Sequence, residues 1–221
     1  PLYPFLLIAS TTRAVDLAIA NLEGPISDRG MNQGSIYSFR FPPADTINGL
    51  QFAGFDVVSL ANNHIWDWGR VAVGDTMTYL ADAGISYVGF GKNYDEANAP
   101  VIRLVGDSNV AFLSFTNLYP KAMEADSDSL GISDFNATQD AVSSLKYSGR
   151  ADIIVVLLHW GEEYQTRSNE QQRRLARQLV EAGADIIIGH HPHVAQEVEY
   201  YSPFPKGSTA KPGGISKSLT A

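Results

Sequence analysis

The 221-residue chain contains no cysteine. This absence excludes disulfide bridges, a thiolate metal site and a catalytic thiol, so any metal would be held by imidazole, carboxylate or amide groups. The sequence also lacks an apolar run near the roughly 20 residues that a membrane-spanning helix needs. Its apolar first segment, residues 1–10, is short and is interrupted by Pro4.

Basic residues are also scarce. The chain has 16 lysines and arginines against 24 aspartates and glutamates, and its formal net charge is −8. A surface of this sign repels a polyphosphate backbone, so we expect no nucleic-acid partner. Four arginines lie close together at positions 167, 173, 174 and 177, but glutamates interleave with them, which is typical of a solvated helix face.

Apolar residues make up 44% of the chain, which is enough to bury a full core. We expect a single domain over residues 1–201. Residues 202–221 are rich in Pro, Gly, Ser, Thr and Lys, and this composition predicts an extended or poorly ordered tail.

Apolar runs bounded by turn residues alternate with amphipathic segments, which predicts an α/β fold whose strands are buried on both faces. Strands are expected at 15–20, 85–88 and 195–201, in a hairpin over 101–105 and 109–115, and directly after Asp56, Asp152 and Asp185. Helices are expected from Pro43 to Gly54 and over 71–83, 138–147 and 168–182. Residues 26–42 and 119–136 are expected to form loops, the second of them exposed. The aspartates should be structural residues at the strand starts, without a catalytic role.

All five histidines lie at the ends of three of these apolar runs, in Asn62-Asn63-His64, His159-Trp160-Gly161-Glu162 and Gly189-His190-His191-Pro192-His193. Open α/β sheets place ligands beyond the carboxyl ends of their strands, so we expect these side chains to converge at one edge. Glu23 follows a further strand, 15–20, and is expected at the same edge.

This set of residues suits a site for one or two divalent cations. Imidazole with carboxylate or amide oxygen favours Mn, Zn or Fe. The candidate ligands are Glu23, Asn63, His159, His191 and His193. Pro192 predicts an extended His191–His193 segment with both rings on one side, whereas His190 should point the other way and be structural.

Five segments, taken together, resemble a known family. They are Asn21-Leu22-Glu23-Gly24-Pro25, Phe39-Arg40-Phe41-Pro42-Pro43, Ser59 to His64 with Asp67-x-Gly69, His159-Trp160-Gly161-Glu162, and His191-Pro192-His193-Val194. In this order they resemble the poly-γ-glutamate capsule-biosynthesis proteins, which are similar to calcineurin-like metallophosphoesterases. The resemblance implies a layered sandwich of mixed β-sheets flanked by helices.

The resemblance also implies roles for individual residues. It implies metal binding by the five candidate ligands, and a general-acid role for His64 steered by Asp67. Arg40 is a candidate for binding a substrate carboxylate or phosphate, with a surface salt bridge as the alternative. Glu162 and Glu163 follow His159 closely enough for one of them to orient an imidazole or touch substrate, with plain solvent exposure as the alternative. Of the two, Glu162 is the candidate for substrate binding.

The chain departs from the family pattern at two places. The family opens with a strand that ends in Gly-Asp, whose Asp is a metal ligand, and nothing before Asp16 matches it. The family also carries a Ser-Leu-Gly-Asn-Phe segment after the His-Pro-His turn, and residues from Ser202 onward lack it. A single metal, weak occupancy or no turnover are therefore open outcomes.

We accordingly expect a metal-dependent hydrolase or transferase that acts on an anionic polymer such as poly-γ-glutamate or on its precursor. It would work outside the cytoplasm, at the membrane or cell surface through a segment absent from this chain, with membrane-bound synthesis subunits as partners. Two alternatives stay open: a non-catalytic polyanion-binding or assembly subunit, and a small-molecule phosphodiesterase.

Overall fold

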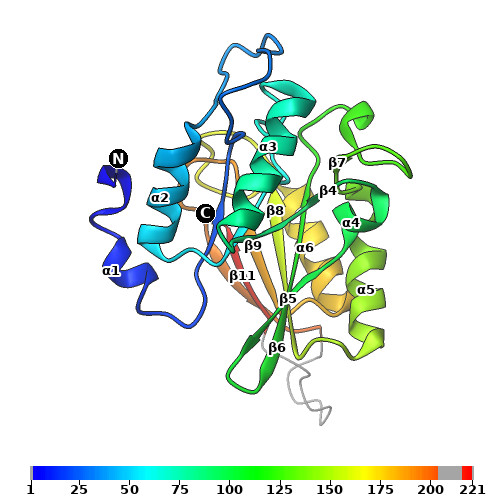
Figure 1. The fold of residues 1–221 in the computed structure, drawn as a ribbon. Helices are drawn as coiled ribbons and strands as arrows, with labels where there is room; N and C mark the ends of the chain where they lie inside the picture. The colour runs from blue at the N-terminus through cyan, green and yellow to red at the C-terminus, as the bar shows by residue number, and fades with distance from the viewer. Residues whose placement is uncertain (1, 204–215, 221) are drawn as a thin grey trace.

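The computed structural model describes residues 2–203 and 216–220, and three apolar clusters divide it into layers. The first cluster joins α2 (Pro43–Ala53) and α3 (Gly69–Asp82) to a three-stranded sheet. The second joins α5 (Thr138–Ser148) and α6 (Glu170–Ala182) to a six-stranded sheet. The third fills the space between the two sheets. The result is the expected layered sandwich, with the helix pairs on opposite sides of the strands (Figure 1).

The smaller sheet is parallel throughout. It contains β1 (Ile19–Asn21), β2 (Val57–Ser59) and β3 (Ser86–Val88), in that order. β1 is shorter than the expected strand over 15–20, and begins at Ile19.

The larger sheet is mixed, in the order β10-β11-β9-β8-β6-β5. Its strands are β5 (Val101–Val105), β6 (Ser108–Thr116), β8 (Ile153–His159), β9 (Ile186–His190), β10 (Val198–Tyr201) and β11 (Ser216–Thr220). β6, β8, β9 and β11 run parallel, whereas β5 and β10 are antiparallel to their neighbours. The expected hairpin is therefore confirmed as β5 and β6.

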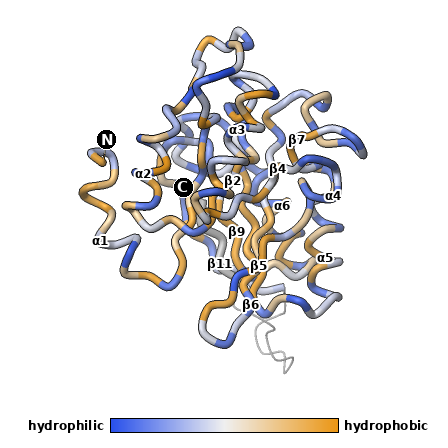
Figure 2. Tube along the Cα trace, viewed as in Figure 1, coloured by the Kyte–Doolittle hydropathy of each residue, from blue (hydrophilic) through white to orange (hydrophobic). Residues whose placement is uncertain are grey.

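Burial on both faces explains the continuous apolar runs. In β8, Ile154, Val156 and Leu158 pack toward the helices, while Val155 and Leu157 pack toward the other sheet. Because successive side chains of a strand point to opposite faces, a strand between two apolar layers needs no polar positions. Figure 2 shows these strands as a hydrophobic centre.

The aspartates that precede the strands join each strand to its neighbour. The carboxylate accepts the backbone N–H of a residue on the adjacent chain segment, and the aspartate N–H donates back to the carbonyl of the same residue. The pairs are Asp56 with Ala18, Asp152 with Asn109, and Asp185 with Ile154, with carboxylate contacts of 2.8, 2.7 and 2.9 Å. Their expected structural role is confirmed.

Two expectations for irregular segments were wrong in part. Residues 119–136 contain β7 (Gly131–Ile132), which pairs with β4 (Phe90–Gly91), and Ile132 is completely buried. Ser216–Thr220, expected to be part of an extended or poorly ordered tail, is extended and forms strand β11 between β9 and β10. Pairing of this kind uses backbone groups, so an apolar composition is not required. Residues 204–215 and 221 of the expected tail lie outside the described residues.

The remaining described elements are short. They are η1 (Tyr3–Phe5), α1 (Ala9–Thr12), α4 (Tyr94–Asn98), η2 (Lys121–Met123) and η3 (Phe135–Ala137). Within the part of the chain that the structure describes, no helix combines the length and apolar character needed to cross a membrane.

Candidate metal centre

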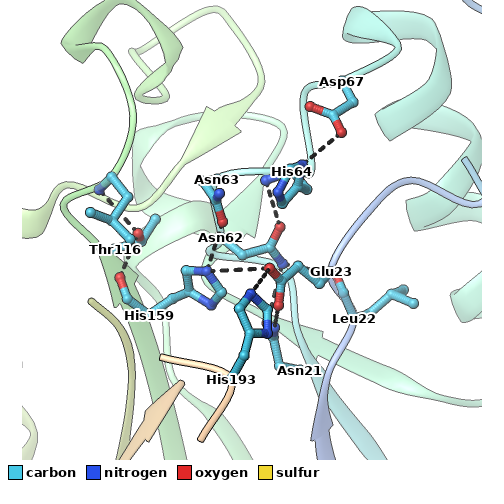
Figure 3. A network of polar contacts seen from close by, with 11 residues as sticks. Asn21, Leu22, Glu23, Asn62, Asn63, His64, Asp67, Thr116, His159 and His193 are labelled. Atoms are coloured by element: carbon cyan, nitrogen blue, oxygen red, sulfur yellow. Dashed lines mark hydrogen bonds and ion pairs between the residues drawn. The ribbon is translucent and has the colours of Figure 1, made fainter. Parts of the chain in front are cut away.

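The carboxyl ends of strands from both sheets meet at one edge of the sandwich. β1 leads to Glu23, β2 leads to Asn63 and His64, β8 ends at His159, and β9 leads to His191 and His193. Figure 3 shows most of these side chains pointing toward one another from separate strands. The expected convergence of the histidine-bearing segments is confirmed.

Glu23 lies between two of the histidines. Its Oε1 atom is 3.8 Å from Nε2 of His159 and 3.9 Å from Nε2 of His193. Its Oε2 atom accepts a hydrogen bond from Nδ2 of Asn21 at 2.8 Å, which fixes the carboxylate orientation. Burial raises the pKa of Glu23, so this carboxylate is costly to keep charged without a nearby cation.

His159 joins the two sheets at this edge. Its ring is 1% exposed, and its Nε2 atom lies 2.7 Å from Oδ1 of Asn63. Thr116, at the end of β6, donates a hydrogen bond to the His159 carbonyl at 2.7 Å and fixes the backbone of this residue. The ring centroid of His159 lies 5.0 Å from that of His191. The five candidate ligands therefore lie together.

Several polar atoms of this cluster are buried without a hydrogen-bond partner. They are Oε1 of Glu23, Nδ1 of His159 and Nδ1 of His191. Burial, with neighbouring histidines as a smaller cause, lowers the pKa of His159 to about 2, and burial also lowers that of His191. Neutral imidazoles offer a lone pair, and unpaired buried acceptors are costly unless a cation is bound. These residues therefore fit a divalent cation.

Among the described residues, two groups have the spacing to hold an ion. Ligand atoms of Glu23, His159 and His191 lie within 4.8 Å of one another, as do those of Glu163, His191 and His193. The first group consists of residues singled out from the sequence. The second contains Glu163, which was not among the five candidate ligands.

His64 and Asp67 form a pair beside the cluster. Nδ1 of His64 lies 2.8 Å from Oδ2 of Asp67, which is 3% exposed. The same carboxylate accepts the backbone N–H of Phe39 at 2.8 Å and the hydroxyl of Ser35 at 3.1 Å. The ring of Phe39 lies against His64, with centroids 4.4 Å apart. Asp67 therefore fixes both the imidazole and the loop that covers it.

Asn62 connects these two parts of the site. Its side-chain oxygen accepts the backbone N–H of His64 at 3.1 Å, and its Nδ2 donates to the carbonyl of Leu22 at 2.8 Å. It thus ties the turn that carries His64 to the segment that carries Glu23. This positioning role was missed, because a fully buried asparagine beside a ligand candidate has no distinguishing sequence pattern.

The His191–His193 segment is not extended as expected. His191 has a φ of 95° and His193 a φ of 57°, so the chain makes a left-handed turn around Pro192. Their rings still converge, with centroids 5.9 Å apart. Such backbone conformations cost about 1–3 kcal/mol each in non-glycine residues and tend to cluster at functional sites.

The substrate-binding candidates occupy different positions. The guanidinium of Arg40 stacks 3.8 Å from the ring centre of Trp68 and donates to the carbonyl of Asp28. Glu162 is exposed. Its neighbour Glu163 is the glutamate near the histidines, because Gly161 takes a φ of 89° and turns the chain after β8. Choosing between two adjacent glutamates would have required knowledge of this turn.

His190 is the last residue of β9 and belongs to neither ligand group. Its carbonyl accepts the backbone N–H of Trp160 at 3.2 Å, and burial lowers the pKa of its ring to about 4. Both observations agree with the structural role expected for it.

Comparison with known proteins assigns the chain to a family. The model described as "Bacterial capsule synthesis protein PGA_cap" matches residues 2–211. The chain belongs to this capsule-synthesis family. The capsule biosynthesis protein CapA of Bacillus anthracis is 38% identical over 161 residues, which cover 71% of this chain and 39% of that protein. The PGA biosynthesis protein CapA of Bacillus subtilis strain 168 is 33% identical over 194 residues, covering 86% and 50%. The chain spans at most half the length of these two relatives.

Solved structures support the fold alone. A phosphatase from Mycoplasma pneumoniae superposes with a TM-score of 0.57 at 14% identity, covering 99% of this chain and 64% of that one. A hypothetical protein from Thermus thermophilus superposes with a TM-score of 0.53 at 21% identity, covering 99% and 69%. The architecture of this capsule-synthesis family member is a metallophosphoesterase-type layered sandwich.

Proposed function

We propose that this family member is a metal-dependent hydrolase or transferase acting on an anionic polymer such as poly-γ-glutamate or on its precursor. The observation that carries the proposal is the gathering of ligand atoms from Glu23, His159 and His191 within 4.8 Å of one another, beside the His64–Asp67 pair. Ligands without partners and a positioned proton donor together suit bond cleavage better than structural support.

The ligands hold the cation and define its type. Glu23, Asn63, His159, His191 and His193 supply imidazole, carboxylate and amide groups, a set that suits Mn, Zn or Fe, one or two ions. When bound, such a cation polarises the scissile group and neutralises the negative charge that develops on it. In a chain with a net charge of −8, a cation also gives a polyanionic substrate a place to bind.

His64 supplies the proton for the leaving group. Asp67 occupies its Nδ1 position, so Nε2 is the atom from which a proton can be given. Phe39 packs against the ring and limits its rotation. Arg40 and Glu162 are the side chains we propose for substrate contact, and Arg40 lies on the same loop as Phe39. We also propose that the protein works outside the cytoplasm with membrane-bound synthesis subunits, in keeping with capsule assembly.

Metal content tests the site. His159→Ala and His191→Ala are expected to abolish uptake of Mn²⁺ or Zn²⁺ by the metal-stripped protein, measured by elemental analysis. His190→Asn is the matched control, because this neighbouring histidine belongs to neither ligand group. Unchanged metal content in the two alanine variants would refute the site.

A turnover assay distinguishes the proposed enzyme from the two alternative functions. Purified poly-γ-glutamate should shorten, or change its end groups, in the presence of the metal-loaded protein and not with His64→Ala. The departures from the family motifs favour a second candidate, a non-catalytic polyanion-binding or assembly subunit. Metal uptake and polymer binding without turnover would support that candidate, and cleavage of a small phosphodiester alone would support a phosphodiesterase.

A further inference from the structure

Gln172 is a buried polar residue that the proposed function leaves without a role. It lies in the first turn of α6, is 4% exposed, and forms a capping box with Asn169 at the start of the helix. Oε1 of Gln172 accepts the backbone N–H of Asn169 at 2.9 Å, and the Asn169 side chain accepts the backbone N–H of Gln172 at 2.9 Å. Because only the oxygen of the Gln172 amide can accept, these bonds fix which way its Nε2 atom faces.

The amide of Gln172 packs against the turn that follows His159. Gly161 has a φ of 89°, and a Cβ atom at this position would lie 2.6 Å from Nε2 and 2.8 Å from Cδ of Gln172. Trp160 is 2% exposed and lines, together with Gln172, a cavity of about 10 Å³, which has room for one water molecule at most. The side chain of Gln172 therefore fills the space beside the Trp160–Gly161 turn.

Hydrogen bonds fasten the other side of this turn and the residues after it. The backbone N–H of Trp160 donates to the carbonyl of His190 at 3.2 Å. Three further bonds join residues 164–168 to residues 192–197. They run from the Tyr164 N–H to the Pro192 carbonyl at 2.7 Å, from the Gln196 side chain to the Gln165 carbonyl at 2.8 Å, and from the Ser168 hydroxyl to the Glu197 carboxylate at 2.6 Å. The start of α6 is therefore joined to both segments that carry candidate ligands.

His159 depends on this support because it is the last residue of β8. The pairing of β8 with β9 ends where His159 lies opposite His190, so the sheet holds the backbone of His159 from the preceding residues only. The Trp160–Gly161 turn holds it from the following residues. A shift of that turn would rotate the imidazole away from Glu23 and Asn63, which lie on segments of the other sheet.

We propose that Gln172 is a positioning residue, which holds the Trp160–Gly161 turn by packing against it and thereby keeps His159 directed toward the cation. The inference rests on the metal site proposed above. It adds to that site a residue that touches neither cation nor substrate, and it assigns to the capping box of α6 a second role besides starting the helix.

Three variants separate packing against the turn from capping of the helix. Gln172→Ala removes both. Asn169→Ala removes the side-chain half of the capping box but keeps the backbone N–H that orients the Gln172 amide. Gln172→Met removes the capping oxygen but keeps a side chain of similar length beside Gly161. Urea unfolding should show all three to be less stable than the wild type, because each loses part of the cap.

Hydrogen exchange of the metal-free protein, followed by NMR, tests the turn directly. The amide protons of Trp160 and Tyr164 report on it through their bonds to His190 and Pro192. Gln172→Ala should speed their exchange about tenfold relative to the wild type, whereas Asn169→Ala and Gln172→Met should stay within about twofold. Equal exchange in the two alanine variants would overturn the proposal, and so would exchange in Gln172→Met that is about tenfold faster than in the wild type.

Cobalt substitution tests the consequence for His159. The visible absorption of bound Co²⁺ reports the arrangement of its ligands, and a titration gives its affinity. Gln172→Ala should change the spectrum and weaken binding about tenfold, as removal of a supporting residue does at other metal sites, while Asn169→Ala should match the wild type. An unchanged spectrum and affinity in Gln172→Ala would overturn the proposal. Failure of the wild type to bind Co²⁺, Mn²⁺ or Zn²⁺ would overturn the proposed function instead, and faster exchange confined to Gln172→Ala would then still show that Gln172 holds the turn.

Discussion

The amide oxygen of Asn63 lies 2.7 Å from Nε2 of His159, across a separation of 96 positions in the chain. Asn63 follows β2 of the smaller sheet, and His159 ends β8 of the larger one. The contact therefore forms only when the two sheets pack face to face. A cation held by both residues would tie the layers together and stabilise the folded protein.

Removing the cation should therefore lower the melting temperature. A ligand that binds only the folded state at 100 times its Kd adds about 2.7 kcal/mol, which for a chain of this size corresponds to roughly 5–10 °C. Differential scanning fluorimetry with EDTA, and then with excess Mn²⁺, measures the shift. Asn63→Ala should reduce the shift, whereas Glu162→Gln should keep it. Identical melting temperatures with EDTA and with Mn²⁺ would contradict the proposal.

The apolar runs and the turn residues that bound them were sufficient to predict which strands form the edge that carries the candidate site. The apolar run before His159 and the run before His190 correspond to β8 and β9, because each strand is buried between two apolar layers. Parallel strands then place their carboxyl ends together, so Asn63 and His159 could be expected at one edge without knowledge of their contact.

Local backbone geometry could not be predicted in the same way. The left-handed turn at His191 and His193 follows from tertiary contacts such as the Tyr164–Pro192 hydrogen bond, and Pro192 alone suggested an extended segment. The same limit applies to the choice of Glu163 over Glu162. The pairing of Ser216–Thr220 within the sheet was not predicted, because amino-acid composition indicates apolar burial but gives no information on backbone hydrogen bonds between strands.

The Asp67 charge should matter for turnover and little for metal binding. Asp67→Asn keeps the shape and one acceptor oxygen for His64 and Phe39, but removes the negative charge beside the imidazole. We expect turnover to fall by about 100-fold, the lower range of general acid–base contributions. Metal content by elemental analysis should not change. Ser35→Ala removes a single neutral donor to the same carboxylate and should leave turnover close to wild type.

The aspartates at the strand starts should differ in their contribution to stability. Asp185 is buried and accepts the N–H of Ile154, so Asp185→Ala leaves a buried donor unpaired and should cost about 1–3 kcal/mol. Asp152 is exposed, and water can replace it at Asn109, so Asp152→Ala should cost less than about 1 kcal/mol. Urea unfolding measures both. Asp185→Asn, which retains an acceptor, should recover most of the loss; equal losses in the two alanine variants would contradict this account.

The metal-free protein should lose stability as the pH falls below about 6.5. Burial holds the pKa of His190 at about 4 and that of His159 at about 2, against 6.5 in the unfolded chain. Between those values the unfolded chain binds protons that the folded protein does not, so acid favours unfolding, by up to about 1.4 kcal/mol per pH unit for each histidine. Above pH 6.5, the pKa of histidine in the unfolded chain, the contribution of these two histidines to stability is fully present and no longer changes with pH.

Glu23 has the opposite effect on stability as the pH falls. Its raised pKa makes the folded protein take up a proton before the unfolded chain does, which favours the folded state. The histidine contribution is read between about pH 7 and pH 5.5, the range in which histidines of the unfolded chain take up their protons. Urea unfolding of the EDTA-treated protein across this range should give a falling free energy of unfolding. His190→Asn should reduce the slope by the share of one histidine. A free energy of unfolding that is flat or rises toward lower pH would show that His159 and His190 are charged in the folded protein.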